Sequence, residues 1–150
     1  MSTHPFVLEP NNYPEPLSVV GIDVTVLVSS AETGGHEITL QTGNEGSGPP
    51  PHSHPWDESF FIVQGEVEFS YADETARGVP GTLFHLPAGT VHGFRICQDG
   101  TVMMEITGQG SKSIAMFASI DEQVAPGLPK PADIPKLIEI LGQFGAKVVD

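Results

Sequence analysis

Apolar and polar residues alternate along much of the chain between residues 18 and 107. The clearest examples are residues 18–30 (SVVGIDVTVLVSS) and residues 36–42 (HEITLQT), which are rich in Val, Ile, Leu and Thr. A period of two is typical of a half-buried β-strand, so each segment is predicted to be one strand. The residues between them, 32–35 (ETGG), predict a turn.

Further short segments of the same kind follow, separated by turn signals such as Gln64-Gly65 and Pro87-Ala88-Gly89. A loop rich in Gly and Pro, residues 43–51, precedes them. The strands predicted here are residues 59–63, 66–71, 82–86, 91–97 and 101–107. Many short strands at this spacing indicate an all-β sandwich or barrel.

The C-terminal part of the chain has a different period. Apolar residues recur every three or four positions at Ile134, Leu137, Ile138, Leu141 and Phe144. Asp133 can cap a helix here, Pro135 suits its first turn, and Gly142 or Gly145 can end it. We therefore expect an amphipathic helix that packs on the barrel or on a partner subunit, and a shorter helix over residues 113–122.

Length and composition indicate one folded domain. The chain has 150 residues, of which 39% are hydrophobic and 17% charged. We expect a single domain over residues 1–150, with its barrel at about 18–107 and its helical segment at about 111–150. No apolar run approaches the ~20 residues of a membrane-spanning helix, and residues 1–16 lack the layout of a secretory signal. Cys97 is the only cysteine, which favours a reducing, cytoplasmic location.

The formal net charge of −13 argues against nucleic acid and anionic membrane surfaces as partners. It identifies no partner by itself, since acidic side chains also keep a protein soluble.

A group of candidate metal ligands lies in residues 52–58 (HSHPWDE). His52 and His54 are two residues apart, so on a strand their imidazoles share a face. A straight strand would carry Glu58 ~13 Å further on, at ~3.3 Å per residue. Pro55 discourages strand continuation, and a turn through Trp56 and Asp57 could return Glu58 to the histidine pair. We therefore predict that one hairpin supplies three donors.

A fourth donor is predicted at His92, which opens the strand after the Pro-Ala-Gly turn at residues 87–89. Imidazoles and a carboxylate suit one divalent transition metal ion, such as Mn, Fe, Co, Ni, Cu or Zn. Four protein ligands on an ion that prefers six would leave two positions for water, substrate or oxygen.

These residues fit two spaced motifs. The first consists of Gly46, five residues, His52-Ser53-His54, three residues, Glu58, six residues and Gly65. The second consists of Gly81, five residues, Pro87-Ala88-Gly89, two residues and His92, and fifteen residues separate the two motifs. Both resemble the motifs of the cupin superfamily, over roughly residues 20–107. The chain as a whole resembles small bacterial quercetin-dioxygenase-like members of that superfamily.

The resemblance implies a jelly-roll β-barrel, a metal bound inside it and a homodimer. It carries the ligand role onto His52, His54, Glu58 and His92. The second motif normally ends in Asn four residues after its histidine, and Ile96 stands there. This departure makes the cavity more apolar.

Strand parity predicts the walls of a substrate pocket. Phe60 and Ile62 share parity with Glu58, while Phe94 and Ile96 share parity with His92. An apolar pocket with few polar groups suits a small organic ligand or substrate.

Several other residues have simpler interpretations. His4 falls in the terminal segment, and His36 and His85 are expected to be structural, although His85 could support a ligand histidine by a hydrogen bond. The pattern favours a solvent-exposed Glu105 over a Glu105 that is buried and acts as a base. Trp56 is expected at the hairpin tip, on the rim of the site or at an interface.

Three functions follow from these residues. The first is a metal-dependent oxygenase, in which Fe, Ni, Mn or Cu serves a hydroxylated aromatic or enediol substrate and Glu58 acts as the catalytic base. The second is a non-redox metalloenzyme, such as an isomerase, lyase or cyclase using an ion such as Zn. The third is a protein that binds a small molecule without turnover.

Overall fold

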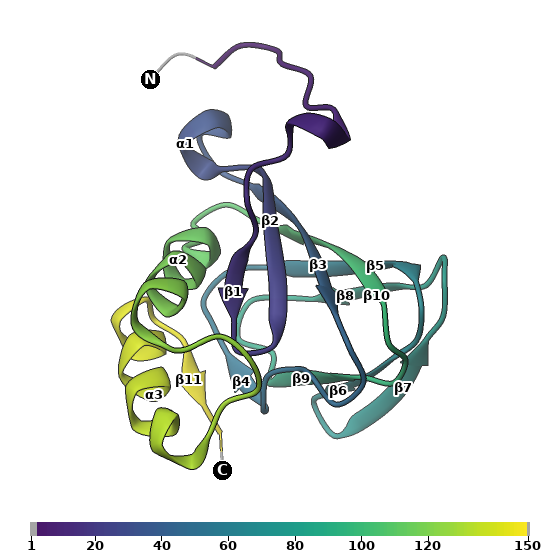
Figure 1. The fold of residues 1–150 in the computed structure, drawn as a ribbon, viewed down its shortest axis with the longest axis vertical. Helices are drawn as coiled ribbons and strands as arrows, with labels where there is room; N and C mark the ends of the chain where they lie inside the picture. Colours follow the sequence, from purple (N-terminus) through teal and green to yellow (C-terminus); the bar gives the residue numbers. More distant parts are fainter. Residues whose placement is uncertain (1–2, 150) are drawn as a thin grey trace.

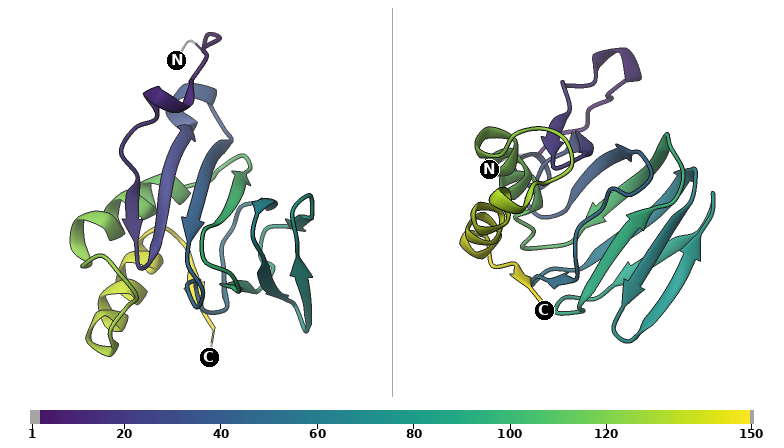
Figure 2. Two further views of the ribbon diagram at one scale, coloured as in Figure 1. Left: turned by 45° about the vertical axis from the view of Figure 1, so that its right-hand side comes forward. Right: turned by 60° about the horizontal axis from the view of Figure 1, so that its bottom comes forward.

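The computed structural model describes residues 3–149 and contains two antiparallel sheets that face each other (Figures 1 and 2). The first sheet has the order β1 (Leu17–Val19), β2 (Ile22–Val28), β3 (Glu37–Gly43), β10 (Thr101–Thr107), β5 (Glu58–Gln64) and β8 (Leu83–Leu86). The second has the order β11 (Lys147–Val148), β4 (His52–Ser53), β9 (His92–Ile96), β6 (Val67–Tyr71) and β7 (Glu74–Gly78). The predicted all-β jelly-roll barrel is confirmed.

The core between the sheets follows from the alternation in the sequence. Every second residue of β10 and β9 is buried, as are Glu58, Phe60 and Ile62 of β5, and these side chains meet those of the opposite sheet. Phe69 stacks on Phe84 with ring centroids 4.1 Å apart. Phe60 lies 5.1 Å from Phe69 and 5.5 Å from Phe94. This cluster of four aromatic rings fills one end of the barrel and leaves the other end for the histidines.

The first predicted strand, residues 18–30, is wrong as a single strand. It is a tight hairpin in which β1 and β2 pair from Val19 opposite Ile22. Val20 and Gly21 form the turn, with φ of 43° and 96°. The alternation continues through the turn, so hydrophobic periodicity alone does not reveal it; Gly21 is the available signal.

Two other local features differ from what the sequence predicted. Residues 30–33 form a short helix, α1 (Ser30–Thr33), which ends at Gly34 in the left-handed conformation, where a turn was expected. Strand β7 was not predicted, because its sequence, ETARG, is polar and mostly exposed. An edge strand of this kind has one paired side and little need for apolar residues.

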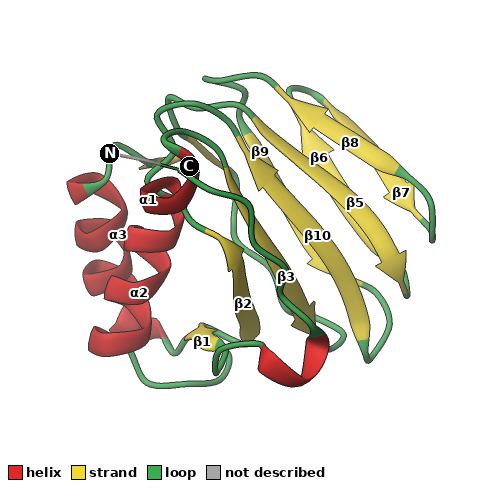
Figure 3. Ribbon diagram, turned by 90° about the horizontal axis from the view of Figure 1, so that it is seen from above, coloured by secondary structure: helices red, strands yellow, loops and turns green. Residues whose placement is uncertain are grey.

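The C-terminal helices pack on the barrel. They are α2 (Ser113–Gln123) and α3 (Ile134–Gln143), which lie side by side (Figure 3), with α2 next to β1 and α3 next to β11. Asp133 does not cap α3 with its side chain; it accepts a hydrogen bond from the backbone N–H of Lys130 at 2.8 Å, in the preceding 3-10 turn η2 (Pro131–Asp133). Another 3-10 turn, η1 (Pro10–Asn12), lies in the exposed N-terminal segment. No helix in residues 3–149 is long and apolar enough to cross a membrane.

Candidate metal centre

His52 lies on β4 and His54 follows directly after it. β4 is held on both sides, because His52 lies opposite His92 of β9 and opposite Val148 of β11. The loop before β4 is fixed as well. The backbone N–H of Gly46 donates to the carbonyl of Ile96 at 2.9 Å, and the Ile96 N–H donates to Ser47 at 2.8 Å. The position of both imidazoles is therefore set by the backbone of the second sheet.

The expected hairpin between His54 and Glu58 is wrong. Residues 54–57 cross from β4 in the second sheet to β5 in the first, so Glu58 faces His54 from the other wall of the barrel. Pro55 at the start of this crossing has no N–H to continue a ladder. Asp57 fixes the end of the crossing. Asp57 Oδ1 accepts a hydrogen bond from the N–H of Ala88 at 2.8 Å, and the Asp57 carbonyl accepts one from the N–H of Gly108 at 2.9 Å.

The Pro-Ala-Gly turn of the second motif holds the first motif in place. Gly89 donates its N–H to the carbonyl of His54 at 2.9 Å, beside the contact between Ala88 and Asp57. The chain then enters β9 at His92, next to His52. Ring centroids of this pair are 4.5 Å apart. The two motifs thus form one backbone unit around the site.

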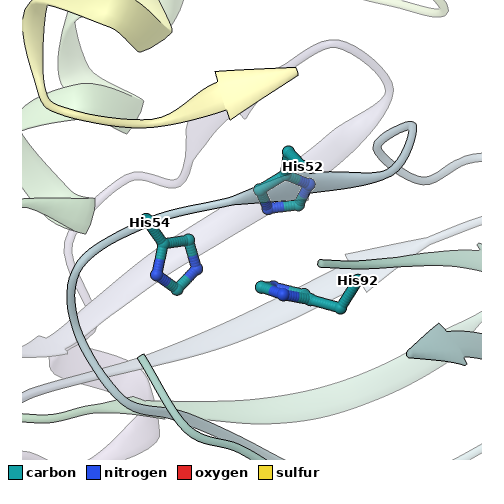
Figure 4. Close-up of side chains that lie close together, drawn as sticks. All are labelled: His52, His54 and His92. Carbon is teal, nitrogen blue, oxygen red and sulfur yellow. The ribbon is translucent and has the colours of Figure 1, made fainter. Parts of the chain in front are cut away.

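The four predicted ligands come together, and the three imidazoles point toward one another from neighbouring strands (Figure 4). The ligand nitrogens of His52, His54 and His92 lie within 4.8 Å of one another. Glu58 Oε1 lies 3.1 Å from Nε2 of His54 and 2.8 Å from Nε2 of His92. His54, His92 and Glu58 are each at most 5% exposed.

Backbone carbonyls orient all three rings. Nδ1 of His52 lies 2.9 Å from the Pro50 carbonyl, Nδ1 of His92 lies 2.8 Å from that of Thr90, and Nδ1 of His54 lies 3.0 Å from that of Trp56. A carbonyl only accepts, so each Nδ1 donates to it and each Nε2 faces the site, where it can bind a metal ion or share a proton with Glu58. A carboxylate oxygen between two such Nε2 atoms needs a cation there, either a proton or a metal ion. The donor set therefore fits a divalent metal.

The charges of the site favour the same conclusion. Burial and the neighbouring His92 lower the pKa of His52 to about 4, so this imidazole is neutral at physiological pH. Burial opposes charge on His92, but its hydrogen bond to Glu58, the charge of Glu58 and the hydrogen bond to Thr90 together raise the pKa of His92. Burial also opposes charge on Glu58, yet hydrogen bonds from Glu105, His54 and His92 hold its pKa well below the usual range. An ionised carboxylate beside three imidazoles is a suitable ligand set for Fe, Mn, Ni or Zn.

The sequence model of the cupin domain family matches residues 36–107, which include both motifs. This part of the chain is a cupin domain. Over 89 residues it is 29% identical to quercetin 2,3-dioxygenase of Bacillus subtilis, a match that covers 58% of this chain and 26% of that enzyme. The chain therefore matches about a quarter of the length of this curated relative.

Solved structures agree with the fold. An RmlC-like cupin of Shewanella frigidimarina superimposes with a TM-score of 0.65 at 14% identity, covering 76% of this chain and 99% of that one. A structure from work on the Mn(II) centres of Bacillus subtilis oxalate decarboxylase gives a TM-score of 0.60 at 17% identity, covering 75% of this chain and 33% of that one.

Glu105 of this cupin is not at the surface, contrary to the expectation from its sequence. It is 2% exposed on β10, where it lies opposite Thr39 of β3 and accepts that hydroxyl's hydrogen bond at 2.9 Å. Burial, followed by its hydrogen bond and charge interaction with Glu58, raises the pKa of Glu105 well above its usual range. The site therefore contains one ionised carboxylate, Glu58, and one neutral carboxyl group. Alternation along β10 places both Met103 and Glu105 inward and could have revealed this.

Trp56 is also buried, at 1% exposure, and not on a rim. Its ring stacks on His54 with centroids 4.5 Å apart and an interplanar angle of 13°, and its carbonyl accepts from the same imidazole. Trp56 thus holds His54 from the side opposite the site. Residues 52, 54, 56 and 58 share parity, which is the sequence signal for this role.

The remaining histidines lie outside the site. His4, His36 and His85 are exposed. His85 hydrogen-bonds with Ser59 Oγ at 2.9 Å and supports none of the ligand imidazoles.

A cavity of about 170 Å³ opens from the metal centre. Phe60 and Phe94 line it, as expected from parity. Ile62 and Ile96 are fully buried, but they belong to the core behind these rings and are not part of the cavity wall. The opposite wall comes from β1, β2 and the C-terminal helices, through side chains such as Val24, Met116, Ile120, Leu137 and Leu141.

Proposed function

We propose that this cupin is a metal-dependent oxygenase acting on a small aromatic or enediol-type substrate. The observation that carries the proposal is the combination of three inward-facing imidazoles and an ionised Glu58 at one end of a mostly apolar cavity. Such a cavity orients a ring so that its polar edge meets the metal centre.

The cavity volume limits the substrate. A 150 Å³ apolar cavity holds one benzene molecule, so about 170 Å³ suits a single ring with small substituents. A catechol fits this size, and a three-ring flavonol exceeds it. The substrate of this chain is therefore proposed to be smaller than quercetin, the substrate in the name of its curated relative.

The chain's own residues would bind and activate such a substrate. Phe60 and Phe94 would pack on its ring, and the helical wall would exclude water. Glu58 would accept the proton of a substrate hydroxyl, because its carboxylate is ionised and buried beside the ligand imidazoles. A bound Fe, Mn, Ni or Cu ion would supply the redox chemistry that allows O₂ to react with the resulting anion.

A non-redox lyase, isomerase or cyclase is the second candidate, and Glu105 is the observation that favours it. A neutral carboxyl group beside an ionised one provides an acid and a base in one cavity, which proton-transfer chemistry requires. A divalent ion such as zinc would then serve as a Lewis acid.

Oxygen consumption distinguishes the two candidates. The metal-loaded protein should consume O₂ with one-ring catechols or enediols, and Glu58→Gln should lower this rate by at least about 100-fold while the protein keeps its fold. Product formation at the same rate without O₂ would favour the second candidate. Binding without product under either condition would reject both.

A homodimer and a cytoplasmic location are also proposed. The outer face of the first sheet carries an apolar strip that includes Phe61, Val63 and Leu83, which are 40%, 47% and 59% exposed. Phe61 and Leu83 lie opposite each other on β5 and β8, so the strip is continuous across two strands. A second copy of the chain would cover it. The location rests on Cys97 as the single cysteine.

A further inference from the structure

Gln41 places an amide inside the cavity, on the inner face of β3. It is 4% exposed, contributes to the cavity wall, and lies between Val24 of β2 and Met103 of β10. The residues directly opposite Gln41 on both neighbouring strands are therefore apolar. Gln41 takes no part in the metal centre described above.

The other buried polar residues of β3 have partners, and Gln41 does not. Thr39 donates to Glu105, and Glu37 accepts from Ser111 Oγ and from the N–H groups of Ile114 and Ser30. Among the hydrogen bonds of residues 3–149, the Gln41 side chain takes part in none. The Gln41 amide faces the cavity, so its hydrogen-bonding groups are open to whatever the cavity holds. Its presence on a cavity wall indicates that a ligand supplies the missing hydrogen bonds.

The position of Gln41 shows which part of a ligand it would meet. Along the inner face of the first sheet, Glu58 belongs to the metal centre, Glu105 lies one strand away, and Gln41 lies beyond it on β3. The polar groups of the cavity therefore extend from the histidines toward Gln41. The helical wall is apolar except for Ser113 at the start of α2.

We propose that Gln41 is a specificity-determining residue: its amide binds a second polar substituent of a one-ring substrate whose first hydroxyl group faces the metal centre. The inference rests on the proposed function and deepens it. It narrows the substrate class to rings that carry two adjacent oxygen substituents and a further hydroxyl or carbonyl group on the far side. A hydroxyl group suits an amide best, because both can donate and accept.

Two matched ligands test this proposal: 4-methylcatechol and 3,4-dihydroxybenzyl alcohol. They share the ring and the adjacent hydroxyl pair, and they differ by one distal hydroxyl group. Their affinities for the metal-loaded protein are measured by calorimetry without O₂. The parent should bind the alcohol about tenfold more tightly, the effect of one net hydrogen bond. Gln41→Met, which keeps the side-chain length, should abolish the preference.

The control is Ile120→Val, which shortens an apolar wall residue and should change both affinities alike. Equal binding of the two ligands by the parent, or an unchanged preference in Gln41→Met, would reject the role of Gln41 and leave the proposed function standing. Failure of the parent to bind either ligand would overturn both proposals, because a one-ring catechol is the class that the proposed function requires.

Stability provides a second readout. The Gln41 side chain makes no hydrogen bond within the protein, so its replacement should not lower the melting temperature of the ligand-free protein, in Gln41→Met and equally in Gln41→Leu. A structural glutamine would behave in the opposite way. A lower melting temperature together with an unchanged ligand preference would show that Gln41 serves the fold alone.

Discussion

At the residue scale, the metal centre depends on hydrogen bonds that fix each imidazole. The sequence motifs predicted His52, His54, Glu58 and His92, because spacing on a strand determines which side chains share a face. The supporting contacts of Trp56 and Glu105 were missed. Their burial depends on which strand lies opposite, and the order of strands is not contained in local periodicity.

Replacement of a ligand histidine should separate metal binding from folding. His54→Ala and His92→Ala should each lower bound metal by an order of magnitude or more, because one of four donors is lost. The cooperative thermal transition should remain, since the hydrophobic core, with Phe69 and Phe84 at its centre, does not need the ion to pack. Metal per chain is measured by elemental analysis after dialysis. His85→Ala is the control, and equal metal content in all variants would reject the site.

Gly48 is a backbone requirement of the loop that carries the site. Its φ is 146°, and a Cβ atom there would collide with the carbonyl oxygen of Phe94 on β9. Gly48→Ala should therefore lower the free energy of unfolding by about 2 kcal/mol or more, measured by denaturant titration.

The same substitution in a helix is the control. Gly142 on α3 has open space around its Cα, so Gly142→Ala should leave stability unchanged or raise it by up to about 1 kcal/mol. If Gly48→Ala proved as stable as the parent, the close approach of this loop to β9 would be wrong.

At the element scale, strands with strict alternation were predicted well and irregular ones were not. The strand at residues 101–107 has the predicted bounds. The turn at Val20-Gly21 and the polar edge strand β7 were not predicted from the alternation of apolar and polar residues. The same holds for β11, which has only two residues and forms because it pairs with β4. Its neighbour His52 makes this short strand part of the site's support.

Removal of β11 should weaken the metal centre. In addition to its pairing with β4, the segment donates the N–H of Val149 to the carbonyl of Pro51 at 3.0 Å. A chain that ends at Ala146 leaves one side of β4 without a partner. We expect its metal affinity to fall about tenfold, in line with the effect of losing the contacts that orient a ligand, as measured by competition with a chelator. Val149→Ala keeps the backbone N–H and should bind metal like the parent; equal affinity of the truncated chain would contradict the role of β11.

At the scale of the whole molecule, the C-terminal helices complete the cavity. The periodicity of residues 134–144 predicted an amphipathic helix but left open whether the barrel or a partner subunit would cover it. The structure places α2 and α3 on the barrel, where Ile120, Leu137 and Leu141 line the cavity. Long-range packing of this kind depends on shape and is not readable from one helix alone.

The exposed strip of the first sheet leads to a prediction about assembly. Leu83→Glu introduces a charge at its most exposed position and should convert a dimer into a folded monomer in sedimentation velocity. Glu74→Lys, on the edge strand β7 of the other sheet, should leave the dimer intact. A parent that sediments as a monomer at micromolar concentration would contradict the proposed dimer.

The central claim is that His52, His54, Glu58 and His92 bind a divalent metal ion at the end of a mostly apolar cavity. Elemental analysis of the protein, purified without chelator or a histidine-rich tag, tests it most directly. The account predicts about one transition metal ion per chain, with Fe, Mn, Ni or Cu favouring the oxygenase and zinc the non-redox candidate. No bound metal, even after incubation with each of these ions, would contradict it.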